Sequence, residues 1–183
     1  MPEGFTIAVE RAEQADVAAL LLDARALMAG LYPPESCHGL DLGAYERPGV
    51  TLFVARAGGV AIGCGAFQLH DDGSAEIKSM FVVPEGRGRG IGRALLEAIE
   101  ATLAGQVTAL RLETGIKQES AIRLYEAAGF RRRGPFGSYR NDPLSVFMEK
   151  ALQVFTIEKS GPRGPSSLRR ARGREASQNT DLF

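Results

Sequence analysis

The feature that most constrains the fold of this chain is a connection rich in glycine and arginine between a strand pattern and a helix pattern. Residues Ser74 to Val83 alternate as a strand, and apolar residues recur at helical spacing from Ile91 to Leu103. The connection, Arg87 to Arg93, has the sequence RGRGIGR, and its glycines let the backbone adopt positive φ and approach a ligand closely. Successive backbone N–H groups there, followed by the positive end of a helix, would form a concavity for an anion. With three arginines adding charge, the segment predicts a pyrophosphate site.

A glycine-rich surface turn with solvated arginines is the alternative for so short a motif. Two other kinds of phosphate site do not match it. The run lacks the Gly-Lys-Ser/Thr of a P-loop. It also misses the glycine spacing of the Rossmann fingerprint, and it follows several strands rather than an N-terminal first strand.

The first half of the chain predicts a helix followed by an antiparallel meander. A strand over Thr6–Glu10 precedes a helix over Gln14–Ala29, which Gly30 is expected to end. A Pro- and Gly-rich stretch follows, with a short helix near residues 41–45. Three strands come next, joined by turns in which Gly58, Gly59 and Gly73 supply positive φ. These strands cover Val50–Arg56, Val60–His70 and Ser74–Val83.

The second half of the chain adds the elements that make the sheet mixed. A strand–helix–strand unit implies that the strands at residues 74–83 and 108–114 are parallel. The elements expected after the helix at Ile91 are a strand over Thr108–Thr114, a helix over Ser120–Ala128 ended by Gly129, a short strand over Phe130–Arg132 and a last strand over Leu144–Leu152.

Composition and charge fit one globular domain with a basic C-terminal extension. Hydrophobic residues make up 44% of the sequence and charged residues 24%, while Lys plus Arg and Asp plus Glu both number 22. The formal net charge is therefore zero, and the overall charge gives no indication of nucleic-acid binding. We expect a domain over residues 1–155 and a disordered tail over residues 156–183, because the tail is rich in Gly, Pro and Ser and poor in apolar residues. Nucleic-acid binding through the tail arginines is an alternative, but the tail lacks interleaved aromatic residues for base stacking.

The sequence favours a cytoplasmic protein without a metal or a membrane segment. No apolar run reaches the roughly 18 residues of a membrane span, and the N-terminus lacks the pattern of a signal peptide. Cys37 and Cys64 have no metal-ligand spacing and are expected to be reduced thiols. His38 and His70 have no ligand partner at helical spacing, so no metal site is expected.

The Gly/Arg connection also carries a family signature. Arg87-x-x-Gly90-x-Gly92 matches the R/Q-x-x-G-x-G/A pattern of the GNAT superfamily of N-acetyltransferases. The longer segments AEIKSMFVVPEGRGRGIGRALLEAIE (75–100) and SAIRLYEAAGF (120–130) resemble that family too, and the resemblance covers residues 6–152. It implies an α/β (α+β) fold: a mixed, mostly antiparallel central sheet of about seven strands flanked by helices, with parallel and splayed fourth and fifth strands.

The resemblance further implies acetyl-CoA as co-substrate of an acyltransferase. The pantetheine arm would lie between the splayed strands, and the Gly/Arg loop would hold the diphosphate. Gln118 stands where the family often has an asparagine. A protein that binds acyl-CoA for regulation, without turnover, is the alternative function. The residues implied to bind acetyl-CoA are Met80, Phe81, Val82, Val83, Arg87, Gly88, Arg89, Gly90, Ile91, Gly92, Arg93 and Gln118.

Two residues are implied as the acid and the base of acetyl transfer. An amine of pKa about 10 is mostly protonated at neutral pH, so a base must take its proton and an acid must protonate the leaving thiolate. Glu76 resembles the glutamate base of histone-acetylating members, and Tyr125 resembles a tyrosine near the thioester sulfur. Strand alternation is expected to place Glu76, Lys78 and Met80 on one face. Two other interpretations stay open, an ion pair for Glu76 and a core aromatic for Tyr125. A backbone N–H near Met80 or Phe81 would meet the oxyanion.

The acceptor pocket is implied to lie between the segment after the first helix and the loop before the last strand. The acceptor is expected to be the amine of a small molecule or a peptide, and Arg140 could bind a carboxylate on it. Ordinary loop roles are the alternative for each residue. Whether the chain forms a homodimer stays open. The candidate contacts are Tyr32, Glu35, Ser36, His38, Tyr139, Arg140 and Asp142.

Overall fold

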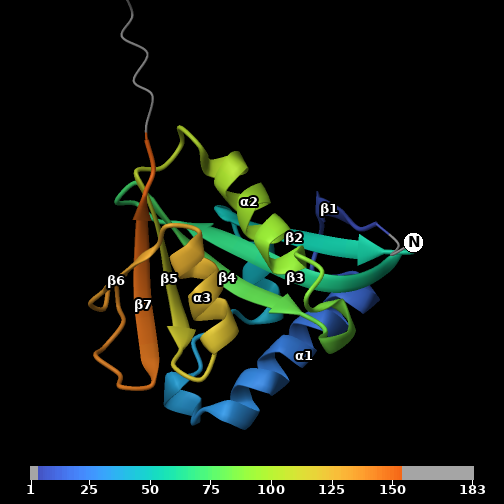
Figure 1. Cartoon of the computed structure of the whole chain (residues 1–183), viewed down its shortest axis with the longest axis horizontal. Helices are drawn as coiled ribbons and strands as arrows, with labels where there is room; N and C mark the ends of the chain where they lie inside the picture. Colours follow the sequence, from blue (N-terminus) through green and yellow to red (C-terminus); the bar gives the residue numbers. More distant parts are fainter. Residues whose placement is uncertain (1–3, 154–183) are drawn as a thin grey trace, which may run out of the picture.

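The fold is built on a seven-stranded mixed sheet (Figure 1). The computed structural model describes residues 4–153, so the predicted domain end at residue 155 and the basic tail lie outside the described residues. The strand order is β1-β2-β3-β4-β5-β7-β6, and within this range β4–β5 is the parallel pair, as predicted. The strands are β1 (Thr6–Val9), β2 (Val50–Ala57), β3 (Val60–Leu69), β4 (Ser74–Val82), β5 (Ala109–Gly115), β6 (Arg131–Arg133) and β7 (Ser145–Ala151).

Helices cover both faces of the sheet. Helix α1 (Ala15–Leu31) packs on one face, and α2 (Ile91–Leu103) and α3 (Glu119–Ala127) pack on the other (Figure 1). Each face has its own core: α2 and α3 present an apolar stripe to the strands, and α1 buries Val17, Leu20 and Leu21. Three short 3₁₀ helices lie in the connections: η1 (Pro34–Ser36), η2 (Leu42–Glu46) and η3 (Pro84–Gly86).

The two cores hold the layers together. Leu95 and Ile99 of α2 are fully buried in one core, and Val17 of α1 and Val54 of β2 are fully buried in the other. Truncating a side chain such as Leu95 to alanine typically costs about 2–5 kcal/mol. The two cores therefore hold the sheet rigid, and with it the side chains that project from its strands.

The end of α1 differs from the prediction made at Gly30. The helix continues through Gly30 to Leu31, and Tyr32 is extended, with φ −133° and ψ 152°. Pro33 is the physical reason, because proline disfavours the helical conformation in the residue before it. Glycine inside a helix costs only about 1 kcal/mol relative to alanine, so it need not end one. Gly129, by contrast, takes φ 91° directly after α3 and ends that helix as predicted.

A bulge at Ser79 interrupts β4. Cys64 and Ala66 of β3, two positions apart, pair with Phe81 and Lys78 of β4, three positions apart, so β4 carries one extra residue. Ser79 accommodates it with φ 57°.

The bulge overturns the prediction that Met80 shares a face with Glu76 and Lys78. Alternation holds only in a regular strand, and the extra residue turns Met80 toward the core under α2 and α3. Glu76 and Lys78 stay together on the α1 face, where Lys78 Nζ lies 2.8 Å from Glu76 Oε1.

Strands β4 and β5 separate beyond this point. Their pairing ends at Ile77 and Leu112, although β4 continues to Val82 and β5 continues to Gly115. The strands are therefore splayed, as predicted. Backbone groups that would otherwise pair across the sheet border the gap and are available to a ligand.

Candidate active site

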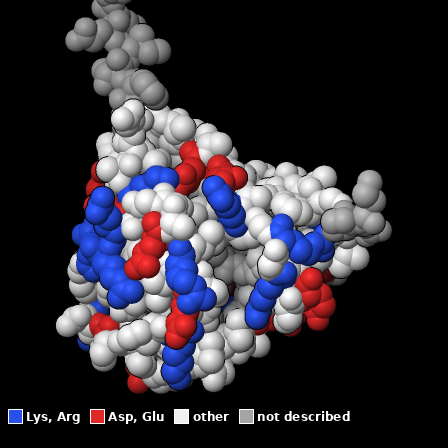
Figure 2. Space-filling model, in the orientation of Figure 1, with Lys and Arg blue, Asp and Glu red and all other residues white. Residues whose placement is uncertain are grey.

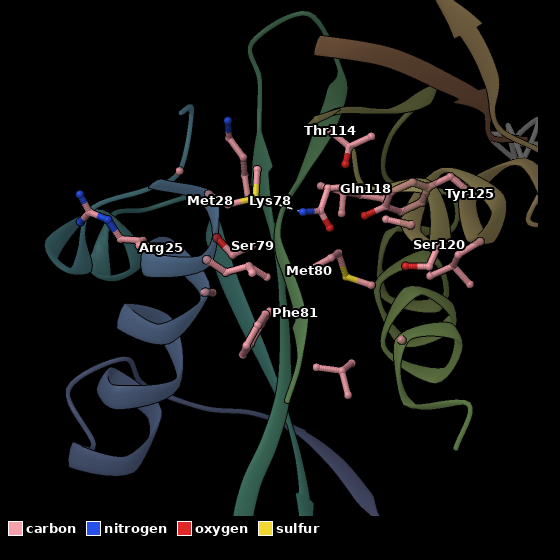
Figure 3. A pocket seen from close by; sticks show the side chains of 18 of the residues that line it. Arg25, Met28, Lys78, Ser79, Met80, Phe81, Thr114, Gln118, Ser120 and Tyr125 are labelled. Atoms are coloured by element: carbon pink, nitrogen blue, oxygen red, sulfur yellow. Dashed lines mark hydrogen bonds between the residues drawn. The ribbon is translucent and has the colours of Figure 1, made fainter. Parts of the chain in front are cut away.

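A cavity of about 870 Å³ occupies the gap between β4 and β5. Its walls come from α1, residues 37–40, β4, the loop at residues 86–93, the end of β5 and α3. In Figure 3, Met80 points from β4 toward α3, whereas Ser79 and Phe81 point toward α1. The cavity thus has a part on each side of β4. Its volume is within the range of small-molecule sites, about 300–1,000 Å³.

The glycine-rich loop forms one end of the cavity and is shaped for an anion. Gly88 and Gly90 take φ 73° and 79°, and a Cβ on either would point into open space. The helical hydrogen bonds of α2 begin with Ala94 N–H donating to Gly90 O at 3.0 Å. The N–H groups of residues 91–93 therefore have no acceptor within the helix and are available to a ligand.

Arginines add positive charge at the same end. Figure 2 shows Lys and Arg side chains on both sides of a hollow, and Arg87, Arg93 and Arg123 are among the residues that line the cavity. Arg87 Nε donates to Val82 O at 3.2 Å, which ties the loop to the end of β4. Backbone donors and arginines together fit the pyrophosphate predicted from the sequence.

Glu113 is a carboxylate in the cavity wall that the sequence analysis misses. It lies on β5, partly buried, and Ser145 Oγ donates to its Oε1 at 2.6 Å. Burial raises the pKa of Glu113, outweighing the opposite effects of the Ser145 hydrogen bond and of the charges on His38 and Lys78. A carboxylate with a raised pKa is a better proton acceptor. No motif marks Glu113, because a glutamate in the alternating stretch TALRLET is typical of a solvent-facing strand residue.

Glu76 lies beside the cavity, and its carboxylate is already engaged. It is 4% exposed and is not among the lining residues. Its Oε1 accepts from Lys78 Nζ at 2.8 Å and from the Tyr139 hydroxyl at 2.5 Å, and its Oε2 lies 3.2 Å from His70 Nε2. A carboxylate bonded through both oxygens is poorly placed to take a proton from an acceptor amine. The geometry therefore favours the ion-pair interpretation of Glu76 over the predicted base.

Tyr125 and Gln118 both reach the cavity from α3 (Figure 3). The Tyr125 ring is buried edge-on against Phe130, with ring centroids 5.7 Å apart. Burial, and secondly the negative charge of Glu113, raise the pKa of Tyr125, so its hydroxyl is protonated at neutral pH. Gln118 precedes the first turn of α3, and its Nε2 donates to Met28 Sδ of α1 at 3.7 Å across the cavity.

Sequence comparison identifies the family. A protein named IAA acetyltransferase from Azospirillum brasilense is 48% identical over 150 residues, which cover 80% of this chain and 97% of that protein. The profile of the acetyltransferase (GNAT) domain matches residues 48–132. The chain belongs to the GNAT family.

Solved structures agree with this GNAT assignment. A candidate acyl-CoA N-acyltransferase from Klebsiella pneumoniae is 37% identical, with a TM-score of 0.71 over 81% of this chain and 98% of that one. A GNAT acetyltransferase from Elizabethkingia anophelis with acetyl-CoA bound shares the fold, with a TM-score of 0.58 at 22% identity over 81% and 98% of the two chains. This GNAT protein is an acetyl-CoA-dependent N-acetyltransferase, and acetyl-CoA is its co-substrate.

Most of the residues predicted to bind acetyl-CoA in this GNAT protein lie in the cavity wall. Val83 and Arg89 do not line it, although both adjoin residues that do. The others remain predicted contacts, and the open space at Gly88 and Gly90 is compatible with a diphosphate there. The predicted contacts that line the cavity are Met80, Phe81, Val82, Arg87, Gly88, Gly90, Ile91, Gly92, Arg93 and Gln118.

Gly90→Ala is expected to weaken acetyl-CoA binding about tenfold or more. A side chain at φ 79° costs roughly 1–2 kcal/mol, and the new Cβ would enter the space left for the diphosphate. Calorimetric titration measures the dissociation constant directly. Gly105→Ala is the matched control, because Gly105 has φ 75° and open space around its Cβ but lies after α2, outside the cavity wall. Equal affinities in both variants would contradict the assignment of the loop.

The predicted acceptor contacts are dispersed in the structure. His38 lines the cavity, and its ring lies edge-on to Tyr139 with centroids 5.0 Å apart. Glu35 and Arg140 are exposed and do not line the cavity. The structure thus brings His38 and Tyr139 together and leaves the two charged residues at the surface.

Tyr32 has a structural contact in place of the predicted acceptor contact. It is buried outside the cavity wall, and its hydroxyl accepts from Lys117 N–H at 2.8 Å. A side chain on Gly115 would overlap the Tyr32 ring. We infer that Tyr32 fixes the turn between β5 and α3. Ser36 and Asp142 hydrogen-bond to each other, which lowers the pKa of Asp142 and links the two predicted acceptor segments.

Three further findings concern residues 4–153. No helix in this range is long and apolar enough to cross a membrane. No group of three or more His, Cys, Asp or Glu side chains in it is placed to hold a metal ion. Cys37 and Cys64 are free thiols, as expected, and Cys64 is buried.

Proposed function

We propose that Glu113 accepts the proton of the acceptor amine and that Tyr125 protonates the leaving thiolate, within one ternary complex. The observation that carries this proposal is the placement of the two groups on opposite sides of the splayed strands. Leu112 packs in the core under α2 and α3, so its neighbour Glu113 faces the α1 side. Tyr125 comes from α3 on the other side. An amine that enters from the α1 side would meet the base, while the thiol would leave on the side of the acid.

The proton balance of this mechanism involves only these two side chains. Acetyl-CoA supplies the thioester carbonyl. The acceptor amine attacks in its neutral form, and as the bond from its nitrogen to the carbonyl carbon forms, the nitrogen gives one proton to Glu113. As the carbon–sulfur bond breaks, the sulfur takes one proton from Tyr125. Exchange with solvent restores both residues, so atoms and charge balance.

We further propose a small-molecule amine as the acceptor, bound between α1, residues 37–40 and β4. Apolar walls from Met28, Leu40 and Phe81 support this, since they can enclose the body of a small molecule. Arg25 is among the residues that line the cavity, with its guanidinium pointing outward from α1 in Figure 3, whereas Arg140 does not line the cavity. Arg25 is therefore the better partner for an acceptor carboxylate. A peptide acceptor, a homodimer and a cytoplasmic location stay predictions from the sequence.

An acceptor panel tests the proposed function. Acetyl-CoA is mixed with the protein and with small amines, short peptides and IAA, the compound in the name of the Azospirillum relative. We expect acceptor-dependent release of the CoA thiol and an acetylated product by mass spectrometry. Pairs of amines that differ only by a carboxylate are tested on Arg25→Met and Arg140→Met. The variant that loses the preference for the amine with the carboxylate shows which arginine binds the acceptor. Tight acetyl-CoA binding without acceptor-dependent release from any compound would favour the non-catalytic acyl-CoA-binding module.

A further inference from the structure

Ser79 holds an unusual backbone conformation in the wall of the cavity. Within residues 4–153 it is the one non-glycine residue with positive φ, at 57°. It forms the bulge of β4 and lines the cavity. A non-glycine residue in the left-handed region costs about 1–3 kcal/mol and persists only where its surroundings hold it there. The contacts of Ser79 should therefore show what holds it.

Two buried side chains hold Ser79 from the α1 side. Its Oγ shares a hydrogen bond of 2.5 Å with the Tyr45 hydroxyl, and its carbonyl oxygen accepts from Cys64 Sγ at 3.3 Å. Tyr45 is 7% exposed and Cys64 is fully buried. Tyr45 belongs to η2, which Asp41 caps by accepting Ala44 N–H at 2.8 Å. The anchor is thus itself fixed by local structure.

The opposite strand is shaped to accept the bulge. A Cβ on Gly65 of β3 would come within 2.5 Å of Met80 Sδ, so the absence of a side chain there makes room for Met80. Figure 3 shows the outcome: Ser79 points toward α1, and the next side chain, Met80, points toward α3. The orientation of the backbone N–H and C=O groups from Ser79 to Phe81 depends on this bulge.

We propose that Tyr45 is a positioning residue, which acts through Ser79 to hold the backbone at Met80 and Phe81 in the orientation that faces the thioester carbonyl. This inference rests on the proposed function and on the prediction from the sequence resemblance that a backbone N–H near Met80 or Phe81 meets the oxyanion. Such a donor works only if it is fixed before the reaction begins. The Tyr45–Ser79 hydrogen bond is the device that fixes it.

Tyr45→Phe and Ser79→Ala remove this hydrogen bond from its two ends. We expect each to lower kcat about tenfold, the effect of one hydrogen bond, with the KM for acetyl-CoA within about twofold of wild type. The double variant should be no slower than either single variant, because both remove the same bond. Ser74→Ala is the matched control, since it also removes a bonded hydroxyl from a buried residue of β4 but outside the cavity wall. Its kcat should stay at the wild-type value.

Ser79→Gly separates positioning from a general structural role. Glycine adopts positive φ without a side-chain anchor, so the bulge should persist, and adding Tyr45→Phe should change kcat less than about twofold. An equal tenfold loss from Tyr45→Phe in the Ser79 and the Ser79→Gly proteins would overturn the proposal.

Amide hydrogen exchange tests the device without turnover. Tyr45→Phe should speed exchange in the segment at residues 78–82 and leave β2 unchanged. Unchanged exchange at residues 78–82 would refute the proposal even if no acceptor is found. Failure of the proposed function would appear separately, as tight acetyl-CoA binding without acceptor-dependent CoA release by the wild-type protein.

Discussion

Replacing Glu113 by glutamine is expected to lower kcat by about 10²- to 10⁴-fold, the usual contribution of a general acid or base. The amide keeps the size of the side chain and can still accept the hydrogen bond from Ser145. It cannot accept a proton from the amine. The loss should appear in kcat, with the affinity for acetyl-CoA unchanged, because Glu113 lies on β5 while the predicted diphosphate site lies at the loop before α2.

The pH profile distinguishes a base from a residue that only positions the acceptor. Burial raises the pKa of Glu113, and a protonated carboxyl cannot accept another proton. Wild-type kcat should therefore fall as the pH drops through that raised pKa. Glu113→Gln should lack this acidic limb, so its deficit should be largest at higher pH. Steady-state rates of both proteins from about pH 5 to 9, with the best acceptor found, show whether each has the acidic limb.

Stability measurements show whether the lost activity comes from unfolding. The pKa of Glu113 is raised in the folded state, so its contribution to stability is present below the unfolded pKa of about 4.3 and is lost as the pH rises through the folded value. Glutamine carries no charge and avoids that loss. The Tm of Glu113→Gln at neutral pH should therefore equal or exceed the wild-type Tm.

Glu76→Gln is the matched control for this prediction. It breaks the ion pair with Lys78 in a nearly dry site, so it should lower the Tm. It should leave the acidic limb of the rate profile in place. A profile that loses the limb in Glu76→Gln and keeps it in Glu113→Gln would assign the base to Glu76, as the sequence resemblance implied.

The element order of this protein could be predicted because its signals are local. The meander follows from alternating residues and from turns at Gly58, Gly59 and Gly73, which take φ 56°, 84° and 77°. The anion site follows from glycines at a strand-to-helix junction, and Gly88 and Gly90 do take the left-handed conformation. In each case glycine marks a position where the backbone takes positive φ, a conformation that other residue types rarely adopt.

The parts that could not be predicted depend on contacts between distant segments. The bulge at Ser79 depends on Tyr45, which lies 34 residues earlier in the sequence, and on Gly65 of the neighbouring strand β3. Serine itself carries no signal for positive φ. Glu113 and Glu76 look alike as glutamates on alternating strands, and only the splay decides which one faces the cavity. The resemblance predicted Tyr125 as the acid, and Tyr125 lines the cavity. Comparing Glu76 with Glu113 as candidate bases required the burial and the hydrogen bonds of both side chains.

Tyr125→Phe is expected to lower kcat by about 10²- to 10⁴-fold while acetyl-CoA affinity stays within about twofold of wild type. Phenylalanine keeps the ring that packs edge-on against Phe130, so the core under α3 should survive. The pKa of Tyr125 is raised, so the hydroxyl stays protonated across the assay range and the deficit should not vary with pH. Stopped-flow measurement of thiol release reports the step directly. Ser74→Ala, which removes a buried hydroxyl outside the cavity wall, serves as the control, with a lower Tm and an unchanged kcat.

The electrostatics between Glu113 and Tyr125 sharpen this last prediction. The negative charge of Glu113 helps to raise the pKa of Tyr125 and so weakens it as an acid. When Glu113 takes the amine proton, that charge disappears, and Tyr125 becomes a stronger acid just as the thiolate leaves. The two residues should therefore act as a unit, and Glu113→Gln/Tyr125→Phe should be much less impaired than the product of the two single losses. Fully multiplicative losses would contradict this coupling. A wild-type rate in Tyr125→Phe would remove Tyr125 from the role of acid and leave water to protonate the thiolate.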